Sequence, residues 1–207
     1  MITGKSLRVN CKERSFGCSV GSQPQDQFSL RGIFRMERGK ICFTKLEDGM
    51  GKEGTKVAAV DVKEIIKDLN RAYADEWLAH YSYLYMARTC TGMMYEDMSE
   101  FLEEIAKDEA EHAEELADRI QELGGLPLAN FSDIEKQCNT PYPKPPKSTS
   151  DYKGMIKVVM DAEAGAIDVY NKLAEKTKGK DHVTYQLVCH ILAEEVGHEE
   201  KFEDLLG

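Results

Sequence analysis

The chain has 207 residues, 42% of them hydrophobic and 31% charged, with a formal net charge of −10 at pH 7. This length suits one sizeable domain, or one domain with an extension. The negative charge disfavours DNA as a partner, because Lys and Arg neutralise the phosphates in DNA complexes.

Membrane insertion and secretion are also disfavoured. No segment approaches the roughly 20 apolar residues that a membrane-spanning helix needs. The opening "MITGKSLRVNCKERSFGC" lacks the apolar core of a secretory signal. Six scattered cysteines without a CxxC pair exclude a rubredoxin-type iron site and a zinc ribbon. We expect a cytoplasmic protein with mostly free thiols and no membrane partner.

The charge divides the chain into two parts. Residues 1–49 carry nine Lys and Arg against five Asp and Glu, a balance of +4, whereas residues 50–207 carry eighteen against thirty-two, a balance of −14. The change falls in the Gly- and Lys-rich joint "LEDGMGKEGTKVAAVDV". We predict an N-terminal extension over residues 1–56 and one domain over residues 57–207.

Within the extension, "QFSLRGIFRMERGKICFTKL" has the pattern of a small β-hairpin, with Phe28, Leu30 and Met36 before a turn around Glu37–Lys40. A hairpin of this size is too small to bury a core alone. Two alternatives stay open: the extension is irregular or disordered, or it lies upstream of a true start at Met50. Mass spectrometry of the native N-terminus separates these alternatives.

After the joint, apolar residues recur with helical spacing in two segments. The first runs from about Asp61 to Thr89, and the second from about Tyr95 to Leu123, where Gly124-Gly125 is a typical helix stop. The following "LPLANFSDIEKQCNTPYPKPPKSTS" holds five of the six prolines, so we predict that it is mostly non-helical.

Two further helical segments follow this proline-rich stretch. One runs from about Asp151 to Lys178 with Ser150 as the expected N-cap, and the other from about His182 to Leu206. Short links pair the four segments into two antiparallel hairpins, and one long crossover joins the hairpins. This connectivity predicts an all-α, ferritin-like four-helix bundle.

The second hairpin repeats a motif of the first. "IAKDEAEHAEEL" contains Glu109 and His112, and "EEVGHEE" repeats this ExxH spacing with Glu195 and His198. Each motif also follows a lone glutamate on the preceding helix: Glu76 lies 33 residues before Glu109, and Glu163 lies 32 residues before Glu195. The duplication separates these residues from an ordinary solvated acidic face.

The repeated pattern predicts a metal site. Glu and His three residues apart lie on one helix face and can hold the same ion. Two such helices, with one Glu from each of the other two, form the inward-facing di-iron or di-manganese arrangement. Without metal, some of the four buried carboxylates would be protonated. The donor set favours iron, with manganese as the alternative, and we expect no haem. The predicted metal ligands and catalytic residues are Glu76, Glu109, His112, Glu163, Glu195 and His198.

Other polar residues receive weaker interpretations. Tyr83 and Tyr170 each follow a lone glutamate by seven residues, so they share its helix face. Three roles stay open for them: hydrogen bonds to the ligands, quenching of a stray radical, or core packing. His80 is interpreted as a core or interface residue and His190 as a packing or surface residue. Four glutamates are interpreted as solvated: Glu111, Glu115, Glu194 and Glu199. Core or loop packing is expected of Tyr81, Tyr85, Met93, Met94 and Met98.

Over residues 60–207 the chain resembles the ferritin-like superfamily, and within it the Dps-like miniferritins called thioferritins. "CNTPYPKPP" and "AEAGAIDVYNKLAEKTKGKDHVTYQLVCHILAEEVGHEEKFEDLL" carry this resemblance. It implies a shell-forming protein that oxidises Fe(II) with hydrogen peroxide or dioxygen, stores the ferric product and protects against oxidative stress. It also implies two iron ions per subunit, held by the six residues named above.

Two details of the resemblance concern thiols and assembly. Cys138 matches the first cysteine of the thioferritin thiol pair, but Gly165 stands where the second is expected, which puts a disulfide switch in doubt. The chain ends nine residues after His198, a length without room for the fifth helix of 24-subunit ferritins. By analogy we favour a homo-oligomer in the form of a dodecameric cage.

Three alternatives compete with this interpretation. A rubrerythrin-like di-iron peroxidase would consume peroxide with an external reductant and store no iron. A structural bundle would hold a static metal or a vestigial site. A nucleoid-associated Dps protein would bind DNA, for which the +4 extension is the one supporting feature.

Overall fold

The computed structural model describes residues 35–37, 40–42, 56 and 58–206. A short antiparallel pair of strands, β1 (Arg35–Glu37) and β2 (Lys40–Cys42), pairs Glu37 with Lys40, as the hairpin prediction requires. Phe28, Leu30 and Met50 lie outside the described residues. The strands and the helices belong to separate units and are described separately. The boundary at residues 56/57 stays a prediction.

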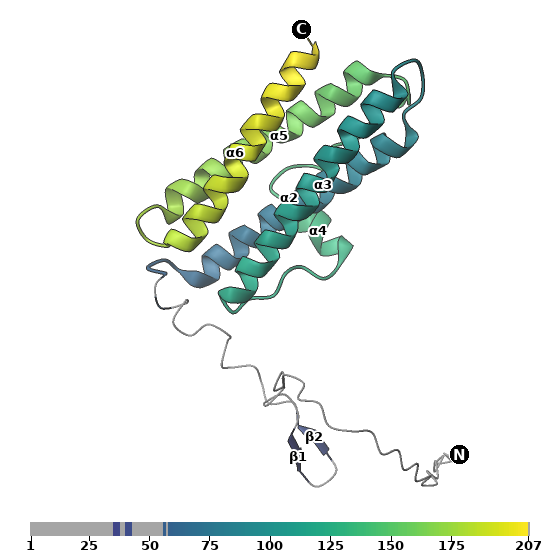
Figure 1. The fold of residues 1–207 in the computed structure, drawn as a ribbon. Coiled ribbons are helices and arrows are strands. Elements are labelled where there is room, and N and C mark those ends of the chain that lie inside the picture. The colour runs from purple at the N-terminus through teal and green to yellow at the C-terminus, as the bar shows by residue number, and fades with distance from the viewer. Residues whose placement is uncertain (1–34, 38–39, 43–55, 57, 207) are drawn as a thin grey trace, which may run out of the picture. The chain divides into compact units, whose positions relative to one another are not determined.

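Four long helices form the bundle that the sequence predicts (Figure 1). Helices α2 (Val62–Thr89) and α3 (Tyr95–Glu122) make the first hairpin. Helices α5 (Tyr152–Thr177) and α6 (His182–Leu206) make the second. The two hairpins lie side by side, and the long crossover from α3 to α5 joins them. The all-α, ferritin-like fold is confirmed.

Aspartates begin three of these helices. The Asp61 carboxylate accepts hydrogen bonds from the backbone N–H groups of Lys63 and Glu64, and Asp181 accepts one from Thr184. At α5 the prediction of Ser150 as the cap is wrong. Asp151 is the cap, because its Oδ1 lies 2.9 Å from the backbone nitrogen of Gly154. The helix therefore begins one residue later than a Ser150 cap implies.

The crossover contains one short helix that the sequence did not reveal. Helix α4 (Phe131–Gln137) lies between Pro127 and Pro141, and it buries Ile134. The proline-rich composition of the whole segment conceals these seven proline-free residues. The rest of the crossover is non-helical, as predicted.

Asp75 fastens the crossover to α2. Its carboxylate accepts hydrogen bonds from the backbone nitrogens of Asn139 and Thr140 at 2.8 and 2.9 Å and from both of their side chains. Ser82, two turns further along α2, donates to the carbonyl oxygen of Pro143. The crossover is thus held against the bundle on either side of Glu76.

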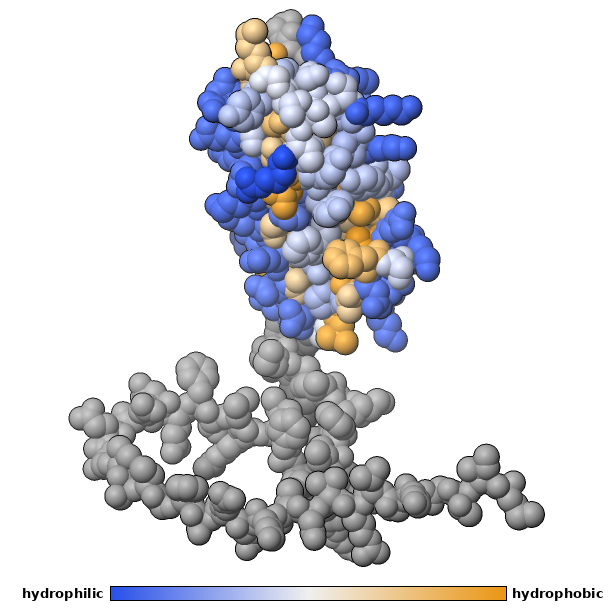
Figure 2. Space-filling model, turned by 90° about the vertical axis from the view of Figure 1, so that its right-hand side faces the viewer, coloured by the Kyte–Doolittle hydropathy of each residue, from blue (hydrophilic) through white to orange (hydrophobic). Residues whose placement is uncertain are grey.

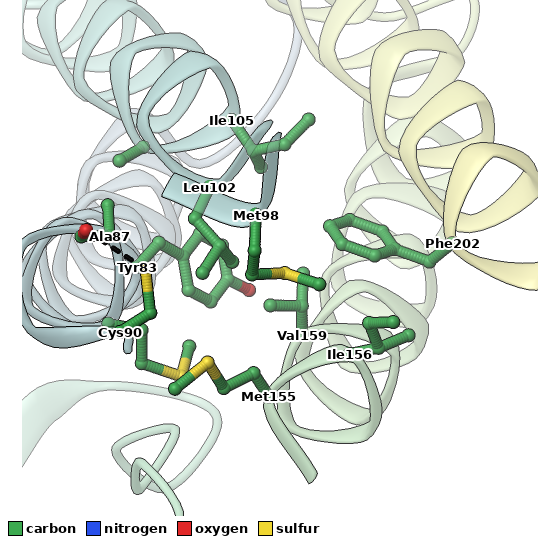
Figure 3. Close-up of a cluster of buried hydrophobic side chains, with 12 residues drawn as sticks. Tyr83, Ala87, Cys90, Met98, Leu102, Ile105, Met155, Ile156, Val159 and Phe202 are labelled. Atoms are coloured by element: carbon green, nitrogen blue, oxygen red, sulfur yellow. Dashed lines mark hydrogen bonds between the residues drawn. The ribbon is translucent and has the colours of Figure 1, made fainter. Parts of the chain in front are cut away.

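The apolar core is divided into two clusters by the middle of the bundle. One cluster joins Tyr83, Met98, Val159 and Phe202, which come from the four different long helices and meet in Figure 3. The other cluster, nearer the opposite end of the helices, includes Leu69, Leu116, Leu173 and Ile191. On every long helix, the predicted metal ligands fall in the interval between these clusters.

A buried ion pair joins the end of α3 to the start of α6. The Arg119 guanidinium lies 3.1 Å from both carboxylate oxygens of Asp181 and donates through Nε to Thr184 at 2.9 Å. Arg119 is 5% exposed, and Asp181 is fully buried. This contact connects the two hairpins at one end of the bundle.

The surface of the bundle is mainly hydrophilic, with separate hydrophobic patches (Figure 2). Met98 is in the core as predicted, but the packing interpretation is wrong for Tyr81, Tyr85, Met93 and Met94, which are exposed. Tyr81 still contacts the crossover, where its ring lies 6.5 Å from that of Tyr142. Among the described residues, no helix is both long and apolar enough to cross a membrane.

Candidate metal centre

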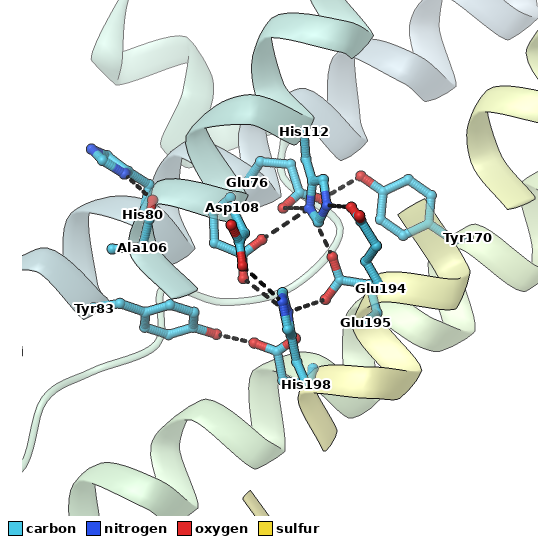
Figure 4. A network of polar contacts seen from close by, with 12 residues as sticks. Glu76, His80, Tyr83, Ala106, Asp108, His112, Tyr170, Glu194, Glu195 and His198 are labelled. Atoms are coloured by element: carbon cyan, nitrogen blue, oxygen red, sulfur yellow. Dashed lines mark hydrogen bonds and ion pairs between the residues drawn. The ribbon is translucent and has the colours of Figure 1, made fainter. Parts of the chain in front are cut away.

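The six residues predicted as ligands meet in the middle of the bundle (Figure 4). Each is at most 3% exposed. Helix α2 contributes Glu76, and α5 contributes Glu163. Each ExxH pair brings two side chains from one turn of α3 or α6, as the helical spacing requires.

These side chains form two overlapping groups. Within each group, one donor atom from every member lies within 4.8 Å of the donor atoms of the others. The first group contains Glu76, Glu109, His112 and Glu195, and the second contains Glu109, Glu163, Glu195 and His198. Glu109 and Glu195 belong to both groups, so each could contribute a carboxylate oxygen to both of them.

Both imidazole rings point Nδ1 toward the carboxylates. Nδ1 of His112 lies 3.0 Å from Glu195 and 3.3 Å from Glu109, and Nδ1 of His198 lies 3.4 Å from Glu163. Several buried atoms here have no hydrogen-bond partner among the described residues, including Glu109 Oε1, Glu163 Oε2 and His198 Nδ1. Unpaired buried donor atoms converging on one point fit cation binding, because burying them without a partner is costly.

The opposite nitrogen of each ring contacts a carboxylate on the other hairpin. His112 Nε2 lies 2.7 Å from Glu194, and His198 Nε2 lies 3.3 Å from Asp108. Such contacts orient a metal-binding imidazole and fix which nitrogen carries the proton. Glu194 is exposed as predicted, with 45% of its side chain accessible, but its contact with His112 was not part of that prediction. The spacing within the helices does not predict the contact of Asp108 either. The sequence does carry one usable signal, because Asp108 and Glu194 each directly precede one of the two shared glutamates.

We predict that Glu194→Ala and Asp108→Ala each weaken the binding of a divalent cation by about 10–100-fold, the usual effect of removing a carboxylate behind a histidine ligand. Titration with Co²⁺, followed by its visible absorption, measures this change. The control is Glu200→Ala, an exposed position on α6. Equal affinities in the three variants would show that the two contacts do not support metal binding.

Tyr83 and Tyr170 tie the hairpins together through the lone glutamates. The Tyr83 hydroxyl donates to Glu163 at 2.9 Å, and the Tyr170 hydroxyl donates to Glu76. Each tyrosine therefore bonds the glutamate of the other hairpin rather than its neighbour on the same helix. Both side chains are essentially fully buried, so they pack in the core and also donate hydrogen bonds to the site.

The charges of the cluster are unevenly distributed. Burial, reinforced by repulsion between the carboxylates, raises the pKa of Glu109 and of Glu195 well above the usual range. At Glu163 burial acts in the same direction, but the neighbouring Glu195, the His198 charge and the hydrogen bond from Tyr83 outweigh it and lower the pKa. For His112, burial is outweighed by the facing carboxylates, and the pKa is raised. Without metal, the shared glutamates retain protons.

This distribution predicts how the stability of the metal-free protein depends on pH. Carboxyl groups and a histidine with raised pKa values bind more protons folded than unfolded, so unfolding becomes easier as pH rises. After chelator treatment, the melting temperature should fall between about pH 5 and 8, and an added divalent cation should offset the fall. Thermal scans with and without Co²⁺ test this, and a melting temperature that rises with pH in the stripped protein would contradict it.

The remaining histidines lie outside the cluster. His80 contacts the carbonyl oxygen of Ala106 through Nδ1 at 2.5 Å and meets the Trp77 ring edge-on, which agrees with the packing interpretation. His190 is exposed on α6 and lies 3.7 Å from Glu194.

Cys138 and Gly165 bear on the thiol prediction. Cys138 is a free thiol. A Cβ atom at Gly165 would lie 2.9 Å from the methyl carbon of Thr140, closer than ordinary van der Waals contact. Thr140 therefore occupies the space beside residue 165 into which a side chain there would project. This packing explains how the chain accommodates glycine at that position.

The fold and the buried Glu/His cluster define a class of protein, the ferritin-like four-helix bundles with a potential metal-binding site in the core. The family model described as the ferritin-like domain matches residues 66–207. This chain belongs to the ferritin-like family.

Individual relatives agree with this assignment. A "DNA protection during starvation protein" of Pyrococcus furiosus is 35% identical over 150 residues, covering 71% of this chain and 79% of that protein. A bacterioferritin of Desulfovibrio desulfuricans is 31% identical over 143 residues, covering 69% of this chain and 74% of that one.

Solved structures give the same picture. The chain superposes on a dodecameric thioferritin, the bacterioferritin-related protein of Bacteroides fragilis, with a TM-score of 0.71 and 35% identity, covering 75% of this chain and 93% of that one. Dps from Staphylococcus aureus, at 18% identity and a TM-score of 0.66, shares the fold over 72% of this chain and 99% of its own. The resemblance to Dps-like miniferritins of the thioferritin group is confirmed.

Proposed function

We propose that this protein is an iron-oxidising miniferritin, an oxidoreductase that takes Fe(II) as substrate and retains the ferric product. The observation that carries the proposal is the pair of overlapping, fully buried ligand groups that share Glu109 and Glu195. Four carboxylates and two imidazoles suit two iron ions per subunit, with manganese as the second choice. Glu76 and Glu163 would complete the two ion positions, and each histidine would bind through Nδ1.

Paired binding accounts for the reaction. Two Fe(II) ions each give up one electron to one hydrogen peroxide, whose O–O bond breaks: two Fe(II), one peroxide and two protons yield two Fe(III) and two waters. Oxidation in pairs avoids the one-electron cleavage that releases hydroxyl radical. Dioxygen is the alternative oxidant. The protonated shared glutamates would release their protons as the cations bind.

We further propose that the chain assembles into a closed homo-oligomer, with a dodecamer favoured. Support comes from the 35% identity to a dodecameric thioferritin. The bundle also exposes apolar side chains that an isolated chain would leave in water: Leu126 is 81% exposed, and Phe131 is 87% exposed.

One experiment separates storage from peroxidase turnover. The native mass is measured by size-exclusion chromatography with light scattering, and Fe(II) is then added in steps together with hydrogen peroxide. A large oligomer that takes up iron far beyond two per chain supports storage. A dimer that stops at about two per chain would remove the storage function and favour the rubrerythrin-like peroxidase. A gel-shift at physiological salt tests DNA binding, which the net charge of −10 disfavours.

A further inference from the structure

A small cavity lies against the metal centre on the side away from the histidines. Its volume is about 20 Å³, little more than one water molecule requires. All four ligand glutamates line it, but neither His112 nor His198 does. The imidazoles therefore close one side of the cluster, and the cavity adjoins the carboxylates on the other side.

Beside Asp75 and Tyr83, small side chains line the walls of the cavity. They are Ala79 on α2 and Ala162 and Ala166 on α5, which flank the lone glutamates on their helices. A larger apolar side chain at any of these positions would fill a space of this volume. The space therefore depends on small side chains on both α2 and α5.

The crossover forms the roof, through Thr140 and Pro143. Thr140 can lie this close to α5 because residue 165 is glycine. A Cβ atom at that position would lie only 2.9 Å from the methyl carbon of Thr140. Asp75 fixes the backbone and the hydroxyl of Thr140 together, and Ser82 holds the carbonyl of Pro143. With hydrogen bonds at both ends, the roof is held in place over the carboxylates.

We infer that this roofed cavity selects the oxidant by size, admitting hydrogen peroxide or dioxygen and excluding alkyl hydroperoxides. This inference rests on the proposed function. A hydroperoxide ROOH could in principle replace peroxide, since two Fe(II) and two protons would convert it into ROH and water. Its reactive O–O group, however, must reach the carboxylates that line the cavity, and a volume of about 20 Å³ beneath Thr140 and Pro143 is too small to hold R as well.

The first test compares oxidants in rapid-mixing experiments on the full-length protein loaded with two Fe(II) per chain. Oxidation by cumene hydroperoxide should be at least about 100-fold slower than by hydrogen peroxide, because single methylene differences in a pocket already change rates by about 10–200-fold. Thr140→Ala removes the methyl and hydroxyl groups of the roof. It should reduce the ratio of the hydrogen peroxide rate to the cumene hydroperoxide rate by at least about tenfold. Thr149→Ala, in the same crossover but outside the cavity, should not change it.

The second test does not depend on turnover. In the Co²⁺-loaded protein, azide should change the visible spectrum of the ion, because a small anion can enter the cavity. Ala162→Leu should abolish the azide response while retaining Co²⁺ binding, and the control Ala164→Leu, exposed on the same helix, should retain both. Retained Co²⁺ binding shows that the leucine variant is folded.

The outcomes separate the inference from the proposed function. Equal rates with the two peroxides, or an unchanged azide response in Ala162→Leu, would overturn the size selection alone. Slow oxidation by every oxidant would overturn the proposed function, and the size selection with it.

Discussion

Replacing Glu109 with glutamine should abolish the rapid oxidation of paired Fe(II), lowering the rate by more than about 100-fold. Removing a carboxylate that hydrogen-bonds a histidine ligand already lowers metal affinity or activity by about 10–100-fold. Glu109 belongs to both predicted ligand groups, so its loss should have a larger effect. A neutral amide cannot bridge two cations as a carboxylate does. The measurement is stopped-flow absorbance of the ferric product after mixing with peroxide.

The variant should still fold, so a loss of oxidation would report on the metal centre and not on unfolding. Burial raises the pKa of Glu109 and so favours its neutral form in the metal-free protein, which glutamine resembles. Thermal melting without metal should show no loss of stability. The matched control is Glu111→Gln, on the exposed side of the same helix. Oxidation at the native rate in Glu109→Gln would remove the assignment of the centre.

Arg119→Met should lower the free energy of unfolding by about 3–5 kcal/mol, because it leaves the fully buried Asp181 without its cation. The loss should be largest near neutral pH. Burial would raise the pKa of Asp181, but its hydrogen bonds with Thr184 and the Arg119 charge lower it. A lowered pKa stabilises the fold above the unfolded value of about 4 and loses this effect as pH falls.

Arg88→Met is the control for this effect. Arg88 lies 2.6 Å from Glu103, but the two side chains are 61% and 46% exposed, so the change should cost at most about 1 kcal/mol. Urea denaturation of both variants gives the comparison. Similar losses would mean that burial of the Arg119–Asp181 pair has no special importance for stability.

Periodicity and spacing were sufficient to predict the bundle and the meeting of the six side chains. The helix ends agree within about one residue, because Asp61, Asp181 and Gly124 are local signals that the flanking sequence shows directly. The duplicated ExxH motif was informative because helical geometry converts a spacing of three into one shared face.

What the sequence did not reveal depends on pairing between helices. The contacts of Glu194 and Asp108 with the histidines require knowledge of which face of α6 meets which face of α3, and sequence spacing within one helix does not contain it. For the same reason, the sequence does not show that each tyrosine donates its hydrogen bond to the lone glutamate of the other hairpin. The role of Thr140 likewise depends on where the crossover lies, which its prolines do not determine.

The arrangement of the ligands has a consequence for how the two halves of the bundle stay together. Each hairpin supplies three ligands to one ion position and lends one glutamate to the other position. The contacts of Glu194, Asp108, Tyr83 and Tyr170 also run from one hairpin to the other. Neither half can therefore complete a predicted ion position alone, and a bound pair of ions would hold the two hairpins together. If the halves were produced as separate polypeptides, we expect their reassociation to depend on the cation concentration, because the proposed substrate would itself join the two parts of the bundle.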